Sequence, residues 1–337
     1  MSLPPTLEPP GEAPERAPIR EAGLLSVVAP VFDEQDGIAE FAARVTAALD
    51  GVRFELVLVD DGSRDATAER LAALAAADPR VKVVFLSRNF GHQPALTAGL
   101  DHARGDVVVM LDSDLQDPPE LIPTMVDHWR RGSDVVYAVR ESRAGETRFK
   151  LVTARGFYRL FARLTRLELT PDSGDFRLMD RRALDALLAM PERNRFLRGM
   201  TVWVGFTQTA VPYHRDARSA GETKFTLSKM LRFSLDAISS FSHAPLQAAT
   251  LLGFAISALA FLMIPLVVVA RYTDLFVQGI SSTLIVILLL GGIQLITVGL
   301  IGEYVGRIYD EVKRRPLYVV RDRTNVEPSE HPPPDFQ

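Results

Sequence analysis

Asp112 and Asp114, separated by one residue, are the pair of side chains in this sequence best suited to chemistry. They follow an apolar run, and side chains at positions i and i+2 of an extended strand face the same way, so the two carboxylates can share one cation. Divalent ions such as Mg²⁺ and Mn²⁺ prefer oxygen ligands and often complete their shell with substrate phosphates. Acidic residues after a strand are also common as solvated turn formers or helix caps, so the pair alone leaves both interpretations open.

Polar clusters also follow two other apolar runs in the same half of the chain. Residues 30–34, Pro-Val-Phe-Asp-Glu, follow one run, and residues 60–63, Asp-Asp-Gly-Ser, follow the next. Ligands of doubly wound sheets bind beyond the carboxyl ends of the strands, so three such clusters predict one shared site. The pair Asp60 and Asp61 has an alternative role as an N-cap for a helix starting near Asp65.

The elements that must position these clusters alternate between strand-like and helix-like patterns. Short runs rich in β-branched residues are typical of buried parallel strands, and the segments between them carry apolar residues at helical spacing. This βαβ rhythm predicts an α/β fold with a doubly wound parallel sheet. The expected strands are 24–29, 54–59, 81–86 and 107–111, and the expected helices are 37–49, 66–77 and 94–103.

Two uncharged apolar runs, residues 244–270 and 275–302, lie near the end of the chain and are separated by four residues. Each exceeds the roughly 20 residues that a helix needs to cross a bilayer, and the short connector predicts a transmembrane hairpin. Basic residues on both outer flanks place the main domain and both termini in the cytoplasm. The alternative is a buried hairpin in a large soluble core.

These patterns divide the chain into six parts. We expect a disordered tail over residues 1–22, a cytoplasmic domain over 23–222 and an interfacial amphipathic helix over 223–243. The two spans, 244–270 and 275–302, come next, and a cytoplasmic segment with a disordered tail from about Asn325 completes the chain at 303–337. No apolar signal peptide is visible in the opening stretch.

Composition excludes several function classes. The sequence has no cysteine, so disulfides and zinc-thiolate sites are impossible. A net charge of −4 argues against a general nucleic-acid binder. Neither a G-x-G-x-x-G nor a G-x-x-x-x-G-K-[ST] loop occurs, which disfavours dinucleotide oxidoreductases and P-loop ATPases.

A set of motifs occurs in a fixed order before the two apolar runs: PVFDE, DDGS, SRNFGHQPALTAGL, DSDLQDPPE, SGDFRLMDRR and AGETKF. Over residues 24–318 the chain resembles the polyisoprenyl-phosphate glycosyltransferases, membrane enzymes of a large inverting family with the GT-A fold, a Rossmann-like nucleotide-sugar-binding domain. The FGHQ and GDFRL segments are more similar to the bacterial undecaprenyl-phosphate glucosyl and aminoarabinosyl transferases than to the dolichol-phosphate mannose synthases. The resemblance implies inverting transfer of one sugar from a nucleotide diphosphate to polyprenyl phosphate at the cytoplasmic face of the bacterial inner membrane.

The resemblance also implies roles for the residues of the three clusters. A Mg²⁺ or Mn²⁺ ion at the metal and diphosphate segment would stabilise the departing nucleotide diphosphate as a Lewis acid. Asp33 stands where the family more often has Asn, and Phe32 where it more often has Tyr. Both differences change hydrogen bonding at the nucleoside, so the resemblance predicts the fold more firmly than it predicts the base of the donor nucleotide. The expected nucleotide-binding residues are Pro30, Phe32, Asp33, Glu34, Asp60, Asp61 and Asp112, and the expected metal ligands are Asp112, Asp114 and Gln116.

Charged residues elsewhere match the acceptor and catalytic positions. A polyprenyl phosphate needs positive charge, for which we expect Arg140 and Lys150 at the lipid phosphate, with Arg215 and Lys224 at the diphosphate. Ordinary attraction to anionic lipid head groups is the alternative for each of these basic residues.

Asp175 is, with Asp114, a candidate catalytic residue. It matches the position of the family's base, yet a phosphate dianion is already a competent nucleophile. Holding a sugar hydroxyl and pairing with Arg177 are therefore alternative roles for Asp175. His92 and Arg177 are weaker candidates for the donor sugar, and a structural role for His92 stays open.

Two alternative functions and several alternative donors stay open. A processive polysaccharide synthase shares the nucleotide-sugar-binding domain. Such a synthase threads its polymer through several membrane helices, for which two helices are too few, and its QxxRW motif is absent here. A membrane-tethered, non-catalytic nucleotide-sugar-binding scaffold is the second rival. We expect UDP-glucose as donor; UDP-N-acetylglucosamine, UDP-galactose and an aminoarabinose donor stay open, with GDP-mannose less favoured. The resemblance further implies a homo-oligomer, with a tetramer expected.

Overall fold

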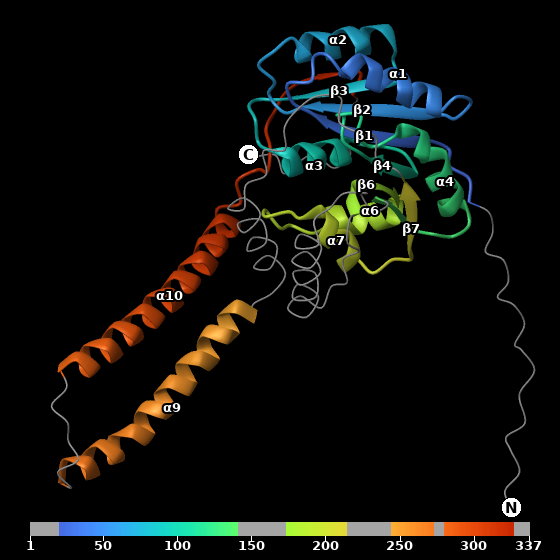
Figure 1. The fold of residues 1–337 in the computed structure, drawn as a ribbon. Coiled ribbons are helices and arrows are strands. Elements are labelled where there is room, and N and C mark those ends of the chain that lie inside the picture. Colours follow the sequence, from blue (N-terminus) through green and yellow to red (C-terminus); the bar gives the residue numbers. More distant parts are fainter. Residues whose placement is uncertain (1–19, 141–172, 214–243, 273–279, 327–337) are drawn as a thin grey trace, which may run out of the picture.

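A central eight-stranded sheet organises the computed structural model, which describes residues 20–140, 173–213, 244–272 and 280–326. The strand order is β7-β5-β6-β4-β1-β2-β3-β8 (Figure 1). The bounds are β1 Leu25–Val31, β2 Phe54–Asp60, β3 Val81–Leu86, β4 Val107–Met110, β5 Val135–Arg140, β6 Ser173–Asp180, β7 Gln208–Tyr213 and β8 Val320–Thr324.

The four strands expected from the sequence all form, and they pair in parallel as β4-β1-β2-β3. Each step from β1 to β4 is made by one crossover helix, the connection that parallel pairing requires. The expected α/β fold is confirmed. The sheet as a whole is mixed, because β6 runs antiparallel to both β4 and β5 and β8 runs antiparallel to β3, while β5 and β7 pair in parallel.

Helices cover both faces of the sheet, as the alternation of side chains along β1 requires. Val27 packs with α1 Ile38–Ala48, α2 Thr67–Ala77 and α4 Ile122–Arg130, which a short 3₁₀ turn, η1 Pro119–Leu121, precedes. Val28 on the opposite face packs with α3 His92–His102, α6 Arg181–Leu188 and α7 Leu197–Trp203. Successive side chains of a strand point to opposite faces, so β1 lies in the middle of three layers.

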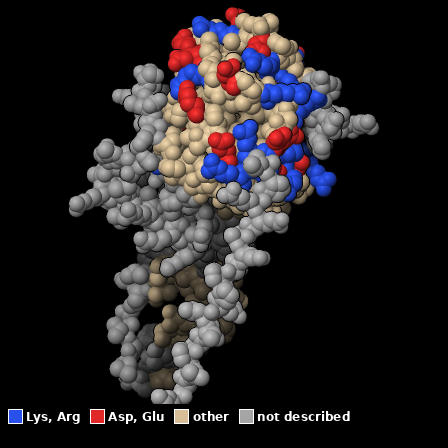
Figure 2. Space-filling model, turned by 90° about the vertical axis from the view of Figure 1, so that its right-hand side faces the viewer, with Lys and Arg blue, Asp and Glu red and all other residues tan. Residues whose placement is uncertain are grey.

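Two long apolar helices, α9 Ala244–Tyr272 and α10 Ile280–Lys313, extend away from this domain (Figure 1). Figure 2 shows charged side chains spread over the domain, whereas the visible parts of the helices below it carry none. Within the described residues, one stretch, Leu289–Lys313, is long and apolar enough to cross a membrane, and Ala249–Met263 is a shorter apolar stretch. Residues 273–279 lie outside the described residues, so the transmembrane hairpin stays a prediction. Helix α10 continues past the expected end at residue 302.

The chain returns to the sheet after α10, which the sequence did not predict. Strand β8 pairs with β3 and forms the edge of the sheet. Buried Tyr318 donates a hydrogen bond to Asp101 on α3 (2.7 Å). Asn325, expected at the start of a disordered tail, donates its side-chain amide to the carbonyls of Ala75 and Val81 (2.7 and 3.0 Å). The ordered domain therefore includes the segment that follows α10.

The expected amino-terminal tail also ends earlier than predicted. Arg20 lies within the expected range 1–22, yet its guanidinium forms ion pairs with Asp134 (2.9 Å) and Asp180 (3.4 Å). Asp134 and Asp180 are both largely buried, so Arg20 compensates two carboxylates that would otherwise be costly to bury.

Candidate active site

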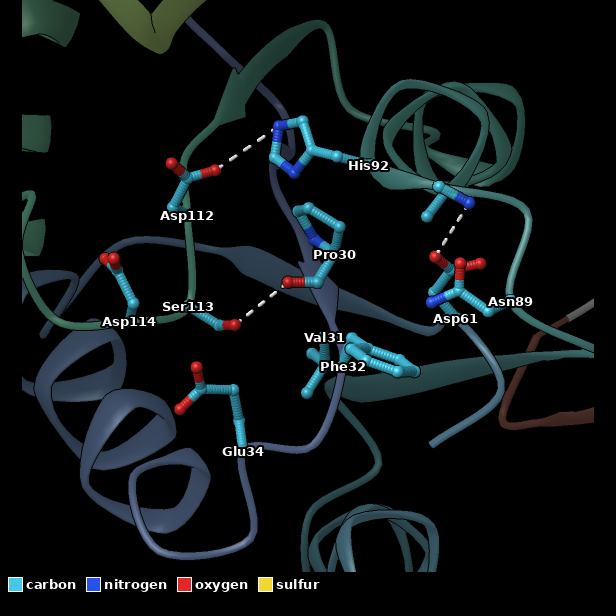
Figure 3. Close-up of a pocket in the computed structure, with 12 residues that line it drawn as sticks. Pro30, Val31, Phe32, Glu34, Asp61, Asn89, His92, Asp112, Ser113 and Asp114 are labelled. Carbon is cyan, nitrogen blue, oxygen red and sulfur yellow. Dashed lines mark hydrogen bonds and ion pairs between the residues drawn. The ribbon is translucent and has the colours of Figure 1, made fainter. Parts of the chain in front are cut away.

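A cavity of about 420 Å³ opens at the carboxyl ends of β1, β2 and β4 (Figure 3). The structure thus brings together the three polar clusters that the sequence placed after these strands. A volume of a few hundred Å³ is within the range of small-molecule and cofactor sites. The lining residues are Pro30, Val31, Phe32, Glu34, Asp61, Asn89, Gly91, His92, Ala95, Asp112, Ser113 and Asp114.

The loop after β1 supplies an apolar ring and a carboxylate to this cavity. Phe32 is 40% exposed and lines the cavity together with Glu34. Asp33, between them, has φ 51°, and its carboxylate accepts a hydrogen bond from the backbone N–H of Arg64 (2.8 Å). Asp33 does not line the cavity, so its expected contact with a nucleoside stays a prediction. Its position in the left-handed region suits Asp or Asn better than other non-glycine residues.

Asp60 and Asp61 at the end of β2 have different environments. Asp60 is buried; one carboxylate oxygen accepts from the backbone of Ser63 (3.0 Å), and the other has no hydrogen-bond partner among the described residues. The Asp61 carboxylate accepts from the backbone N–H groups of Phe90 (2.7 Å) and Gly91 (2.9 Å). Burial raises the pKa of Asp61, although these two amides act against it.

The N-cap alternative for the two aspartates is wrong. Helix α2 begins at Thr67 with Ala66 in the cap position, and no side chain caps it. Asp61 instead fixes the loop between β3 and α3, and through it the position of His92 at the start of α3.

Asp112 and Asp114 lie in a turn beyond the end of β4, not on the strand itself. Both line the cavity, while Ser113 between them donates its hydroxyl to the carbonyl of Pro30 (2.9 Å). Asp114 accepts a hydrogen bond from the backbone N–H of Gln116 (3.1 Å). The turn, anchored to β1 by Ser113, thus presents both carboxylates to the cavity, where an extended strand had been expected to do so (Figure 3).

These carboxylates fit a divalent cation that also binds a ligand. One oxygen of Asp112 is buried without a hydrogen bond, and burial raises the pKa of Asp112 to about 6, against the effect of His92. Within the described part of the chain, no group of three or more His, Cys, Asp or Glu side chains is placed to hold a metal ion. The residues therefore suit an ion that Asp112 and Asp114 hold in part and phosphates and water complete. Gln116 is buried and does not line the cavity, so its expected role as a ligand stays a prediction.

His92 links the turn after β4 to Asp175 on β6. Its Nε2 atom lies 3.5 Å from a carboxylate oxygen of Asp112 and 3.3 Å from one of Asp175. Burial lowers the pKa of His92, but the hydrogen bond to Asp175 and the neighbouring carboxylates outweigh it, so the pKa is raised overall. The two acidic groups thus favour the protonated form of His92, which lines the cavity between them.

Asp175 is held by several donors. Gln93 donates its amide to Asp175 (3.1 Å), and Arg198 on α7 lies 3.7 Å from the other carboxylate oxygen. Burial raises the pKa of Asp175, but His92, Arg198 and Arg177 outweigh burial, so the pKa lies well below its usual value. A carboxylate held at a low pKa is a poor proton acceptor, which favours a positioning or charge-balancing role over that of a general base.

Arg177 is buried and makes its hydrogen bonds within the fold. Its guanidinium donates to the carbonyl of Gly174 (2.9 Å) and to the hydroxyl of Thr201. Burial lowers its pKa to about 10. Arg177 does not line the cavity, so the structure gives it a supporting place behind Asp175 and leaves its contact with a sugar as a prediction.

Arg140 at the end of β5 belongs to a second polar group beside the site. Its guanidinium donates to the Tyr213 hydroxyl (3.0 Å) and lies 3.7 Å from buried Asp117, which also binds the Tyr213 hydroxyl. Its Nη2 lies close to Gly174, the residue before Asp175. The other expected basic ligands, Lys150, Arg215 and Lys224, lie outside the described residues, as does the expected interfacial helix, 223–243.

Sequence reasoning missed three residues of the site. The FGHQ segment could have pointed to Gln93, which belongs to it. The side-chain amide of Gln93 joins Asp175 to the backbone of Leu197 (3.1 Å), a link that only the fold reveals. Asn89 belongs to the motif SRNFGHQPALTAGL, but nothing in the sequence places it in the cavity, and Arg198 carries no distinguishing local pattern. Arg198 reaches Asp175 because α7 packs against β6, a contact between segments that no spacing predicts.

Comparisons with known proteins place the chain among sugar-transferring enzymes. The family model described as glycosyl transferase family 2 matches residues 26–188. The chain is 48% identical to an uncharacterized glycosyltransferase, YkcC, of Bacillus subtilis, over 90% of this chain and 94% of that protein. It is 42% identical to the prophage bactoprenol glucosyl transferase homolog of Escherichia coli, over 88% and 98% of the two chains.

Among solved structures, glucosyl-3-phosphoglycerate synthase from Mycobacterium tuberculosis is 24% identical, with a TM-score of 0.44 over 64% of this chain and 77% of that one. The identity to the Bacillus relative, over nearly the whole length of both chains, decides the assignment. With its mixed α/β sheet and the site at the strand ends, the protein belongs to glycosyltransferase family 2.

Proposed function

We propose that this protein transfers one sugar from a nucleotide-diphosphate sugar to polyprenyl phosphate at the cytoplasmic face of a membrane. The donor that we expect is UDP-glucose. The observation that carries the proposal is the cavity in which Asp112 and Asp114 face Phe32 and Asp61. The names of the relatives, bactoprenol glucosyl transferases of Escherichia coli and of Shigella phage SfII at 42% identity, support the lipid acceptor. Helix α10 supports the membrane location.

Each part of the cavity suits one part of the donor. The exposed ring of Phe32 suits stacking on a base, since base–aromatic stacking contributes about 1–3 kcal/mol. Asp112 and Asp114 would hold a Mg²⁺ or Mn²⁺ ion, which when bound neutralises the charge that develops on the leaving diphosphate. His92 lines the cavity beside Asp112 and contacts Asp175 behind it, where the sugar would follow the diphosphate.

The reaction forms one bond and breaks one. An oxygen of the polyprenyl phosphate attacks the anomeric carbon while the bond from that carbon to the diphosphate breaks, so the nucleoside diphosphate leaves and the configuration inverts. The phosphate dianion brings its own electron pair, so orientation and charge neutralisation contribute more than proton removal. Arg140, which is held by Asp117 and Tyr213, supplies fixed positive charge on the acceptor side.

A panel of labelled donors tests this proposal. Purified protein in detergent is incubated with undecaprenyl phosphate and, in separate reactions, with UDP-glucose, UDP-N-acetylglucosamine, UDP-galactose and GDP-mannose. We expect lipid-extractable product from UDP-glucose, a large loss in Asp175→Asn, and no loss in the matched control Asp185→Asn, whose carboxylate is exposed on α6. Nucleotide binding without lipid product from any donor contradicts the proposal and favours a non-catalytic scaffold.

A further inference from the structure

The guanidinium of Arg198 on α7 lies beside Asp175 and makes no hydrogen bond within the described part of the chain. Its Nη2 atom is 3.7 Å from Oδ1 of Asp175, which is too far for a hydrogen bond. Its Nε atom is buried without a partner. A guanidinium carries five N–H donors, and a buried donor without an acceptor is costly. Arg198 therefore suits a ligand that supplies an acceptor at this position.

Asp175 offers such a ligand one of its two carboxylate oxygens. Its Oδ2 atom accepts a hydrogen bond from Gln93 (3.1 Å) and lies 3.3 Å from Nε2 of His92. Its Oδ1 atom faces Arg198 instead. The side chains of Arg198 and Asp175 are 25% and 14% exposed, so both remain accessible to a ligand.

Two contacts hold α7 against β6 and so fix the position of Arg198. Gln93, which binds the β6 carboxylate, also accepts a hydrogen bond from the backbone N–H of Leu197 (3.1 Å). Arg177 on β6 donates to the hydroxyl of Thr201, which lies on the next turn of α7. The two charged groups therefore face each other across a gap whose width is set by the fold.

The chemistry of this gap favours a neutral hydroxyl over an anion. An oxygen atom placed in it can lie about 2.8 Å from both groups, the usual length of such hydrogen bonds. A hydroxyl fits, because it donates its proton to Oδ1 of Asp175 and accepts from Nη2 of Arg198. The pKa of Asp175 lies well below its usual value, so its carboxylate is ionised at neutral pH. An ionised phosphate oxygen has no proton to donate and would be repelled by this carboxylate.

We propose that Arg198 and Asp175 together bind one hydroxyl of the transferred sugar, and that this contact selects the donor. His92 contacts both Asp112 and Asp175, so the pair lies next to the carboxylates proposed to hold the diphosphate. A sugar that lacks this hydroxyl leaves both charged groups without their partner, which is how a polar site rejects an analogue. The inference rests on the proposed function, because it requires a nucleotide sugar in the cavity.

Donor analogues that each lack one sugar hydroxyl test the contact in the natural protein. Transfer to undecaprenyl phosphate is measured with UDP-glucose and with each analogue. We expect kcat/KM to fall roughly 10- to 100-fold for at least one analogue, as for the loss of hydrogen bonds to charged groups. Equal values of kcat/KM with every analogue overturn the proposal without the need for a variant.

The variant Arg198→Met then identifies the hydroxyl that the guanidinium binds. With UDP-glucose, kcat/KM should fall roughly 10- to 100-fold. With the analogue that lacks the bound hydroxyl, the variant and the natural protein should agree within about twofold, because the contact is already absent there. An equal loss with every donor shows a structural defect and overturns the proposal. Arg193→Met is the matched control and should leave all rates unchanged, since Arg193 contacts Glu311 through its backbone N–H (2.9 Å).

Calorimetric binding without the lipid acceptor separates this inference from the proposed function. We expect Arg198→Met to bind UDP as the natural protein does, because UDP carries no sugar, and to bind UDP-glucose more weakly. Equal affinity of both proteins for UDP-glucose overturns the proposal. Weaker binding of UDP by the variant also overturns it and assigns Arg198 to the diphosphate. Absence of transfer from any donor by the natural protein overturns the proposed function, while the binding measurement still decides whether the contact exists.

Discussion

His92 lies between two carboxylates that come from neighbouring strands of the sheet, one after β4 and one on β6. This bridge joins the turn proposed to hold a cation to the group proposed to face the sugar. Two neighbouring carboxylates repel each other when both are ionised, and His92 acts against this by lowering the pKa of Asp112 and of Asp175. A histidine between them therefore suits a cavity that two acidic groups share.

Phe32 provides a prediction at the residue scale. Replacing the exposed ring in Phe32→Ala should raise KM for the nucleotide sugar by a factor that corresponds to about 1–3 kcal/mol, because base stacking is lost in ground state and transition state alike. The value of kcat should change little. Steady-state kinetics measure both quantities, and Phe32→Tyr, which keeps the ring, is the control. A fall in kcat at unchanged KM would place Phe32 away from the base.

At the scale of elements, the loop after β2 is packed directly on the loop after β3. Gly62 has φ 70°, and a Cβ there would lie 2.5 Å from the carbonyl carbon of Arg88. We predict that Gly62→Ala lowers the free energy of unfolding and weakens nucleotide binding, because backbone cannot yield as a flexible side chain does. Gly51 is the matched control, since its φ is 73° but nothing lies within 4 Å of its Cβ position.

Gly51→Ala should cost only the left-handed strain, about 1–2 kcal/mol, and leave binding unchanged. Denaturant unfolding and calorimetric titration with UDP compare the two variants. Equal losses of stability with binding intact in both would show that the two loops are free to separate.

Asp180 provides a second prediction at this scale, because it accepts hydrogen bonds at the start of α6 from Arg182 and from the indole of Trp129 (2.9 Å). Asp180→Ala should lower the free energy of unfolding by about 1–3 kcal/mol through loss of the cap and of the acceptor for a buried N–H. The measurement is urea unfolding of detergent-solubilised protein.

The pH dependence of this difference has a definite sign. Burial raises the pKa of Asp180, but Trp129 and Arg182 outweigh it, so the folded pKa lies below its usual value. A depressed pKa stabilises the fold above the unfolded pKa and ceases to do so as pH falls through the folded pKa. The difference between natural protein and variant should thus be constant near neutral pH and shrink below about pH 4. A difference that grows in acid would contradict this role.

The sequence predicted the elements well where periodicity was local. The four parallel strands and α1, α2 and α3 lie within two residues of their expected bounds. In a buried βαβ unit, the apolar run of the strand and the helical spacing of apolar residues each occupy a contiguous stretch of sequence, so both can be recognised locally. Convergence of the polar clusters followed from the topology of such units. The partners of Asp175 did not follow, since Gln93 and Arg198 reach it from two helices that meet only in the folded protein.

At the scale of the whole molecule, the return of the chain from α10 to the sheet joins this long apolar helix to the domain that holds the candidate site. Strand β8 is short, lacks a clear apolar pattern and lies far from β3 in sequence, so only tertiary pairing defines it. Tyr318 and Asn325 reinforce the contact on either side of the strand. The domain thus holds the end of α10 on one side of its sheet, close to the edge strand.

Truncation tests this connection. Ending the chain after Tyr318 removes β8 and exposes the edge of β3, so we predict a lower melting temperature and aggregation, since an unpaired edge strand is a template for association. Ending it after residue 326 keeps β8 and every described contact, and should leave the melting temperature unchanged. Thermal unfolding with a light-scattering readout compares the two. Equal behaviour would mean that β8 adds nothing to the domain.

Sugar transfer by this protein should depend on the carboxylates of the turn after β4. We would measure butanol-extractable radioactivity formed from labelled UDP-glucose and undecaprenyl phosphate, with Mn²⁺ or with EDTA, by the natural protein, Asp114→Asn and the control Asp127→Asn, whose carboxylate is exposed on α4. We predict Mn²⁺-dependent product from the natural protein and Asp127→Asn, and at least about a hundredfold less from Asp114→Asn, as for loss of electrostatic stabilisation of a transition state. Undiminished product from Asp114→Asn, or full activity in EDTA, would contradict the account.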